Sequence, residues 1–107
     1  ADEAQSPLGP LHADRNGGYH GYYYKILYAQ GEDAKGGAYS YLLGDQMQSG
    51  FALIAWPKEY GVTGIMSFIV SHDGIVYERN LGEDGASIAE QTLNYNPSSD
   101  WTAIGKL

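Results

Sequence analysis

The sequence predicts an α+β fold: a mostly antiparallel sheet of about four or five strands with one short C-terminal helix and an extended N-terminal arm. Apolar residues alternate with other residues, or run together, over stretches of strand length. The 15 glycines and 10 tyrosines favour turns and strands over a helical bundle. Because the chain has 107 residues, it has room for one hydrophobic core, which excludes two independent domains.

Residues 1–18 are expected to form the extended arm, because prolines and glycines interrupt regular structure throughout this segment. Leu8 and Leu11 are its only large aliphatic side chains. We expect them to attach the arm to the body of the domain or to a partner. Residues 19–107 are then the single α+β domain.

The first strand is expected over His20–Tyr28, which is dense in tyrosine and aliphatic residues. Ala29–Gly37 is rich in glycine and acidic residues and is expected to be a loop. A short strand over Ala38–Leu43 follows, and Gly44–Met47 turns the chain.

The central strand is expected over Gly50–Trp56, a continuous apolar run that Pro57 ends and that is typical of a strand buried on both faces. Alternation predicts another strand over Ile65–Ser71. The Asp-Gly pair in His72–Gly74 then predicts a hairpin with a type I′ turn into a strand over Ile75–Asn80.

A helix is expected over roughly Gly85–Tyr95, where apolar residues form a stripe with helical spacing. Asp84 is a suitable N-cap, and Pro97 ends the helix. In the tail, Trp101 and Ile104 are large enough to close an edge of the core.

Charge and cysteine content exclude several classes of partner and site. Thirteen acidic and 6 basic side chains give a formal charge of -7, which repels phosphate backbones and anionic lipid headgroups, so we expect no nucleic-acid partner. The absence of cysteine excludes disulfides, thiolate metal sites and a cysteine nucleophile. The longest apolar stretch, Phe51–Trp56, is too short to span a membrane. We expect no signal peptide in the polar first residues, which are compatible with a terminus left by processing.

The histidines and acidic residues form no catalytic or metal pattern. His72 and Asp73 fall on the expected turn, and His20 is expected at a strand end, bonded to backbone. The acidic pairs Glu32-Asp33 and Glu83-Asp84 lack a calcium-loop pattern and are expected to be solvated. Zinc-ligand spacing and serine-nucleophile frames are also missing. We therefore expect no catalytic residue, no metal site and no cofactor.

Tyrosine is the unusual feature of this chain. Because a strand alternates faces, the tyrosines around the first strand cannot all enter one core, and some must be exposed. Exposed tyrosine is typical of protein interfaces and of ligand stacking. The interface candidates, which include the leucines of the arm, are Leu8, Leu11, Tyr19, Tyr22, Tyr23, Tyr24 and Tyr28, and the ligand-stacking candidates are Trp56 and Trp101.

Several segments of the chain carry a family resemblance by their order and spacing. They are the signature His20–Leu27 (HGYYYKIL) with Ala29-Gln30-Gly31, and the segments Gly36–Tyr39, Gly50–Pro57, Glu59–Gly64 and His72–Tyr77. This set resembles the C-terminal part of an uncharacterised family of bacterial exported proteins with a domain of unknown function. The resemblance spans Ser6 to Trp101 and implies an extracytoplasmic location, in the periplasm, at the cell surface or secreted. Members of that family carry a longer N-terminal part, which implies a processed or partial product here.

Residues 50–79 carry a second resemblance. The turn Gly61-Val62-Thr63-Gly64 and the Asp-Gly hairpin are similar to the globular heads of type IV pilins and pseudopilins. This resemblance implies a role in a filament, for which the long apolar pilin helix would come from a separate chain.

Three functions are expected from these observations, in order. The first is a non-enzymatic, extracytoplasmic structural or accessory subunit that acts through protein–protein contacts or self-assembly in a surface filament or periplasmic assembly. The second is a glycan- or peptide-binding module that uses exposed tyrosine and tryptophan. The third is a small hydrolase that uses His20 or His72 with an acidic partner.

Overall fold

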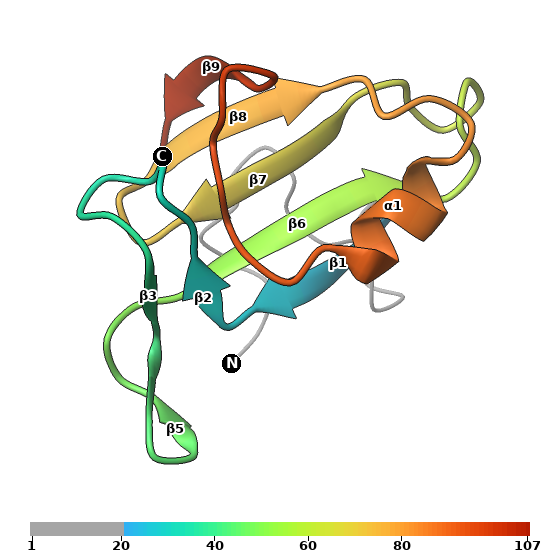
Figure 1. Ribbon diagram of the computed structural model, residues 1–107. Coiled ribbons are helices and arrows are strands. Elements are labelled where there is room, and N and C mark those ends of the chain that lie inside the picture. The colour runs from blue at the N-terminus through green and yellow to red at the C-terminus, as the bar shows by residue number, and fades with distance from the viewer. Residues whose placement is uncertain (1–20) are drawn as a thin grey trace.

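A computed structural model describes residues 21–107, and its largest element is a five-stranded antiparallel sheet with the order β1-β6-β7-β8-β9 (Figure 1). Its strands are β1 (Tyr22–Leu27), β6 (Ala52–Pro57), β7 (Ser67–Ser71), β8 (Ile75–Arg79) and β9 (Thr102–Lys106). Two small two-stranded sheets pair β2 (Ala29–Gln30) with β3 (Tyr39–Ser40), and β4 (Leu42–Leu43) with β5 (Gln46–Met47). The only helix in this part of the chain is α1 (Gly85–Gln91).

The fold is therefore mostly β, with one short helix, and the prediction of an α+β domain is corrected to this extent. The predicted antiparallel sheet is confirmed. The predicted arm over residues 1–18, together with Tyr19 and His20, lies outside the described residues.

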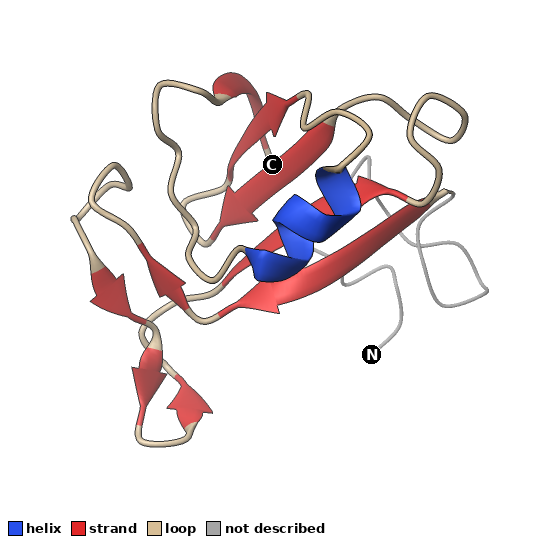
Figure 2. Ribbon diagram, turned by 45° about the vertical axis from the view of Figure 1, so that its right-hand side comes forward, coloured by secondary structure: helices blue, strands red, loops and turns tan. Residues whose placement is uncertain are grey.

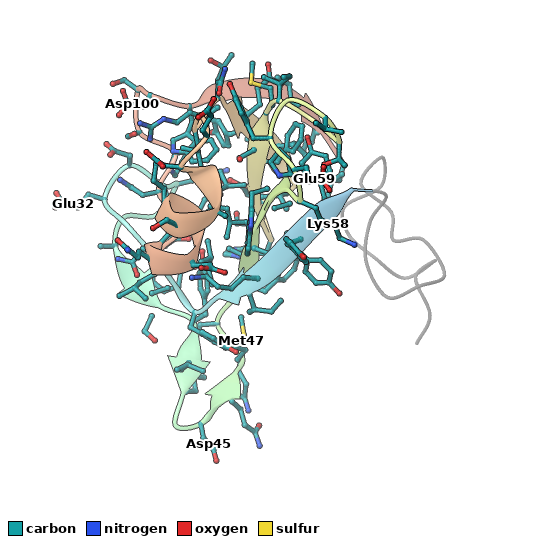
Figure 3. The ribbon with its side chains drawn as sticks, turned by 90° about the vertical axis from the view of Figure 1, so that its right-hand side faces the viewer. Glu32, Asp45, Met47, Lys58, Glu59 and Asp100 are labelled. Atoms are coloured by element: carbon teal, nitrogen blue, oxygen red, sulfur yellow. The ribbon has the colours of Figure 1, made fainter. Side chains whose placement is uncertain are left out.

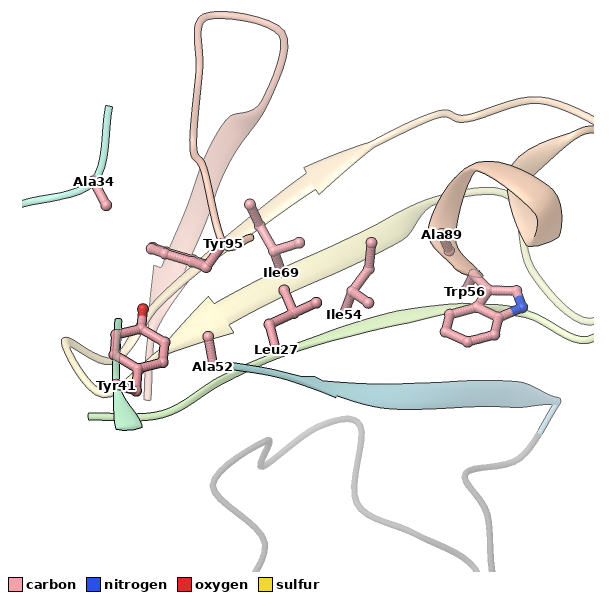
Figure 4. Packing of buried hydrophobic residues seen from close by; sticks show 9 residues of the cluster. All are labelled: Leu27, Ala34, Tyr41, Ala52, Ile54, Trp56, Ile69, Ala89 and Tyr95. Atoms are coloured by element: carbon pink, nitrogen blue, oxygen red, sulfur yellow. The ribbon is translucent and has the colours of Figure 1, made fainter. Parts of the chain in front are cut away.

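Strand β6 lies inside the sheet between β1 and β7, and all six of its residues are buried, as the continuous apolar run predicted. The middle strand of the five is β7, so the prediction of β6 as the central strand is corrected to an interior strand. Because side chains alternate across a strand, β6 contributes to a cluster on each face of the sheet. Ile54 and Trp56 belong to the larger cluster, and Leu53 packs with Val70 and Val76 on the other face. Figure 4 shows the larger cluster, with Leu27, Ile54 and Ile69 between the sheet and the segments that cover it.

Helix α1 lies over one face of the sheet (Figure 2). Its Ala89 is fully buried in the larger cluster, and the Lys25 ammonium of β1 donates to the Glu90 carbonyl at 2.6 Å. The hydrogen bond places a cation at the C-terminal end of the helix, where carbonyl groups have no partner within the helix.

The helix is shorter than predicted, because Thr92 adopts extended backbone angles and Tyr95 joins the β2 region. The Tyr95 N–H donates to the Ala29 carbonyl at 2.9 Å, and the Gly31 N–H donates to the Tyr95 carbonyl at 2.8 Å. The predicted side-chain cap is also wrong. Asp84 occupies the N-cap position, but its carboxylate makes no capping hydrogen bond.

The hairpin predicted at residues 72–74 is confirmed, but its turn is not type I′. A type I′ turn needs positive φ at both central residues, and among the described residues only glycines have positive φ. The Gly74 N–H donates to the Ser71 carbonyl at 2.9 Å with Gly74 at φ 83°. This is the geometry of a three-residue loop that ends in a left-handed glycine.

The strand predicted over Ala38–Leu43 is divided in two by Tyr41. Tyr41 is fully buried, and its N–H donates to the Tyr28 carbonyl at 2.9 Å. The chain turns into the core at this point, and β4 and β5 then form a hairpin that projects from the body (Figure 1). Figure 3 shows Asp45 at the tip of this hairpin.

Candidate functional site

An apolar groove of about 280 Å³ lies where β1 ends beside the segment that follows α1. It is lined by residues from two distant parts of the sequence, Lys25 to Tyr28 and Thr92 to Leu93. Leu93 is 75% exposed and Tyr28 is 52% exposed. Large apolar side chains at this level of exposure around a groove are typical of a contact surface. We call the depression lined by Lys25 to Tyr28, Thr92 and Leu93 the β1 groove.

Hydrogen bonds fix the walls of the β1 groove. Lys25 is joined to the end of α1 through the Glu90 carbonyl, and the Thr92 hydroxyl donates to the Ile88 carbonyl at 2.8 Å. The Tyr28 carbonyl accepts the Tyr41 N–H at 2.9 Å. The groove is therefore preformed, which reduces the entropy cost of binding.

The tyrosines of β1 differ in exposure, and the prediction that some of them are exposed is confirmed. Tyr22 packs on Phe68 with ring centroids 5.8 Å apart, and its hydroxyl donates to the Met66 carbonyl at 2.8 Å. Burial raises the pKa of Tyr22, and the charge of Glu78 adds to the increase. These contacts indicate a structural role for Tyr22.

Tyr23, Tyr24 and Tyr28 present more surface to solvent. Tyr23 is 52% exposed, packs beside Trp56 with ring centroids 6.0 Å apart, and has the Lys58 ammonium 5.3 Å from its ring centroid. Tyr24 is 44% exposed and lies on the opposite face of the sheet from Tyr23. The structure thus leaves these three tyrosines accessible, and Tyr28 is the one that lines the groove.

The two tryptophan candidates differ in exposure. Trp56 is 5% exposed and belongs to the larger core cluster, where Figure 4 shows it beside Ala89. The prediction of Trp56 as a ligand-stacking platform is wrong, because its ring faces are covered. Trp101 is partly buried and lines a second pocket of about 220 Å³, between α1, β8 and residues 94–101.

The second pocket has a mixed polar and apolar lining. Leu81 and Ile88 supply apolar surface, and Arg79, Thr92 and Asn94 supply polar groups. The guanidinium carbon of Arg79 lies 5.8 Å from the centroid of the Trp101 ring. A cation over an indole face is attracted by the ring quadrupole, so the pair forms one wall of the pocket. We call this site the Arg79 pocket.

The environment of His72 is aromatic. Its ring nitrogens lie 3.4 Å from the Tyr39 hydroxyl and 3.3 Å from the Phe51 backbone N–H, and its ring packs edge-on against Tyr41. The neighbouring carboxylate of Asp73 accepts the Ile75 N–H at 3.0 Å. Asp73 therefore stabilises the turn, and the base-and-carboxylate pair that a hydrolase would use is not assembled at this position.

Among residues 21–107, histidine and acidic side chains form no group of three or more that could hold a metal ion. No helix between these residues is long and apolar enough to cross a membrane.

A protein family of unknown function, DUF2950, matches residues 1–104 of the chain. The chain belongs to the DUF2950 family. This confirms the resemblance to an uncharacterised family. Neither the curated proteins nor the solved structures contain a match to this DUF2950 chain.

The structure brings only some of the predicted residues together. Tyr28 enters the β1 groove, Trp101 enters the Arg79 pocket, and Leu8, Leu11 and Tyr19 lie outside the described residues. The sequence did not indicate Leu93 or Arg79. Leu93 occurs inside an expected helical stripe, and a lone arginine at a strand end carries no motif.

The β4–β5 hairpin was also not predicted as a contact site. Its Leu43 is 57% exposed and its Leu42 is 37% exposed. The sequence signal for this exposure is a pair of adjacent leucines just before the Gly-Asp turn. Neighbouring side chains of a strand point to opposite faces, so the two leucines cannot both pack into one core.

Proposed function

We propose that this chain is a non-enzymatic, extracytoplasmic structural or accessory subunit that binds a protein partner at the β1 groove. The observation that carries the proposal is the groove itself, an apolar depression with Leu93 and Tyr28 exposed at its rim. In protein interfaces, a few aromatic or aliphatic side chains of one partner supply most of the binding energy, and they insert into apolar depressions of the other partner.

The groove has the size and chemistry to accept a short apolar segment. Its volume of about 280 Å³ suits one or two side chains of a partner rather than a large ligand. The Lys25 ammonium is engaged by the Glu90 carbonyl, so the groove offers mainly apolar contact. The exposed leucines of the β4–β5 hairpin, Leu42 and Leu43, offer further apolar contact surface.

The proposed location is the periplasm, the cell surface or the medium, in line with the resemblance to exported proteins. The similarity of residues 50–79 to pilin heads supports a place in a surface filament, with the spanning helix in another chain. Fractionation of the native cells tests this location. Recovery of the chain in the cytoplasmic fraction contradicts it.

Variants of exposed residues test the β1 groove. We expect Leu93→Ser and Tyr28→Ser to abolish the complex that the chain forms in its native source, while each changes the free energy of unfolding by no more than about 0.5 kcal/mol. The control is Val62→Ser, because Val62 is 77% exposed and Leu93 is 75% exposed, and Val62 lies in the loop before β7. Light scattering and intact mass spectrometry of the isolated material measure the complex.

Two results contradict the proposal. One is a native chain that is isolated as a free 11.6 kDa monomer. The other is equal loss of the complex in Val62→Ser and Leu93→Ser, which would show that binding does not use the groove.

A second candidate function is a glycan- or peptide-binding module, and the Arg79 pocket favours it. Trp101 lines this pocket with the amide of Asn94 and the hydroxyl of Thr92. An aromatic ring beside amide and hydroxyl groups offers both stacking and hydrogen bonds to a small polar ligand.

A further inference from the structure

We propose that the Arg79 pocket binds the carboxylate of an acidic sugar and that Arg79 is the residue that recognises it. The inference rests on the second candidate function and specifies the class of ligand. It does not depend on the β1 groove, which shares only Thr92 with this pocket.

The first observation is the state of the Arg79 side chain. Arg79 occupies the end of β8, opposite Ser67 of β7, and its guanidinium lies over the Trp101 ring. Within the described part of the chain, the guanidinium forms no ion pair with a carboxylate. A guanidinium carries five N–H donors in one plane, and its edge matches the two oxygens of a carboxylate. The stacked ring orients this group before a ligand arrives.

The second observation is the lining that surrounds this cation. Ser98 has a hydroxyl group and Asn94 has an amide, so hydrogen-bonding groups accompany the guanidinium. The Thr92 hydroxyl donates to the Ile88 carbonyl at 2.8 Å, so toward a ligand it is an acceptor only. Asn96 is a wall of the pocket rather than a donor, because its side chain is engaged by Asp33. The Asn96 amide donates to the Asp33 carboxylate at 3.0 Å and its oxygen accepts the Asp33 N–H at 2.8 Å.

The third observation is the size of the pocket. Its volume of about 220 Å³ is below the roughly 300–1,000 Å³ of pockets for drug-sized ligands, so it accepts one small ring or group. Leu81 and Ile88 supply apolar surface for the faces of such a ring. A single sugar with one carboxylate therefore matches the volume, the apolar surface, the hydrogen-bonding groups and the cation together.

The charge of the chain makes this cation selective. The formal charge of -7 repels anions from most of the surface, so an anionic ligand needs a local positive group. Arg79 is one of only 6 basic residues in the sequence. An uncharged sugar cannot form the charge-assisted, two-point contact that the guanidinium offers.

A matched pair of sugars tests the inference on the full chain. Glucuronate and glucose differ by a carboxylate in place of a hydroxymethyl group, and Trp101 fluorescence in a Trp56→Phe background reports binding at the pocket. We expect saturable quenching by glucuronate and binding of glucose weaker by about tenfold or more. Increased salt is expected to weaken glucuronate binding.

Three variants identify the residue. Arg79→Gln is expected to weaken glucuronate binding by about tenfold or more, and Arg79→Lys to restore part of it, because lysine keeps the charge but not the planar pair of donors. The control Lys106→Gln removes a cation from exposed β9 and is expected to leave binding unchanged. Circular dichroism establishes that each variant is folded.

The outcomes separate the inference from the candidate function on which it rests. Equal affinity for glucose and glucuronate keeps a sugar-binding pocket and overturns carboxylate recognition. Binding of N-acetylglycine without binding of glucuronate overturns the acidic sugar and points to a peptide carboxylate. Absence of saturable binding by any of the three probes overturns both proposals, and unchanged binding in Arg79→Gln overturns the role of Arg79.

Discussion

Trp56→Ala is expected to lower the free energy of unfolding by about 3–5 kcal/mol, because it removes a large buried ring and leaves a cavity. Trp56 is 5% exposed, belongs to the larger core cluster, and lies in β6 between β1 and β7. A loss of this size is a large part of the total stability of a small domain. Urea unfolding followed by far-ultraviolet circular dichroism measures it.

Two control variants test whether the loss of stability in Trp56→Ala comes from the loss of the buried ring. Trp101→Ala is expected to cost less than Trp56→Ala, since Trp101 is only partly buried. Trp56→Phe keeps an aromatic ring and removes an indole N–H that has no hydrogen-bond partner in the described part of the chain, so we expect a cost of less than about 1.5 kcal/mol. A cost below about 1 kcal/mol for Trp56→Ala would show that the ring is not part of the core.

The sheet was predictable because its strands have strong local signals. The apolar run of β6 requires burial on both faces, and a glycine after Asp73 ends β7 in a tight turn. The turn type was not predictable from the Asp-Gly pair alone. That pair suits a type I′ turn, but it also suits a longer loop in which Gly74 alone is left-handed.

The end of α1 was not predictable, because a distant contact decides it. Local apolar spacing continues through Thr92 to Tyr95, but the backbone of Tyr95 pairs with Ala29 and Gly31 instead. Tertiary hydrogen bonds thus override helical periodicity over the last turn. The β1 groove exists because the helix stops at Gln91 and leaves Leu93 exposed.

The candidate sites were predictable only in part for the same reason. The presence of some exposed tyrosine on β1 was predictable, because the alternation of side chains along one strand prevents successive tyrosines from entering the same core. The β1 groove and the Arg79 pocket each combine residues that are more than a dozen positions apart in sequence. Trp56 was predicted wrongly for a related reason. The sequence shows an aromatic ring that could stack on a ligand, but it does not show whether the fold buries that ring.

Loss of stability above pH 10 is expected from two fully buried tyrosines. Burial raises the pKa of Tyr95 to about 12, Asp73 and Tyr77 act in the same direction, and nearby Ser71 acts against them. Burial also raises the pKa of Tyr41, and Tyr39, Tyr95 and Asp73 contribute to this increase. No cysteine thiol titrates in this range.

The direction of the pH effect follows from the raised values. In the unfolded chain a tyrosine ionises near pH 10, whereas in the folded chain Tyr95 keeps its proton to about pH 12. The stability contribution is therefore complete below about pH 10 and is lost as pH rises toward the folded-state pKa. Urea unfolding at a series of pH values measures the loss. A free energy of unfolding that stays constant through pH 12 contradicts this prediction.

Removal of the Tyr41 hydroxyl is expected to cost more stability at neutral pH than removal of the Tyr95 hydroxyl. The Tyr41 hydroxyl donates to the Gln30 side-chain oxygen at 3.0 Å, and the Gln30 amide donates to the Lys35 and Gly37 carbonyls. Tyr41→Phe leaves the buried Gln30 oxygen without this donor, so we expect a cost of about 1–3 kcal/mol.

Tyr95→Phe is expected to change the free energy of unfolding by less than about 1 kcal/mol at pH 7, because the buried Tyr95 hydroxyl has no hydrogen-bond partner among residues 21–107 and Ser71 does not reach hydrogen-bond geometry. Both variants are expected to retain their remaining stability to higher pH than the wild type, since each removes one group that ionises on unfolding. A Tyr95→Phe profile that falls above pH 10 as steeply as that of the wild type would assign the alkaline loss to other groups. Because Tyr41 and Tyr95 pack in the same cluster, the double variant is expected to show the flattest alkaline profile.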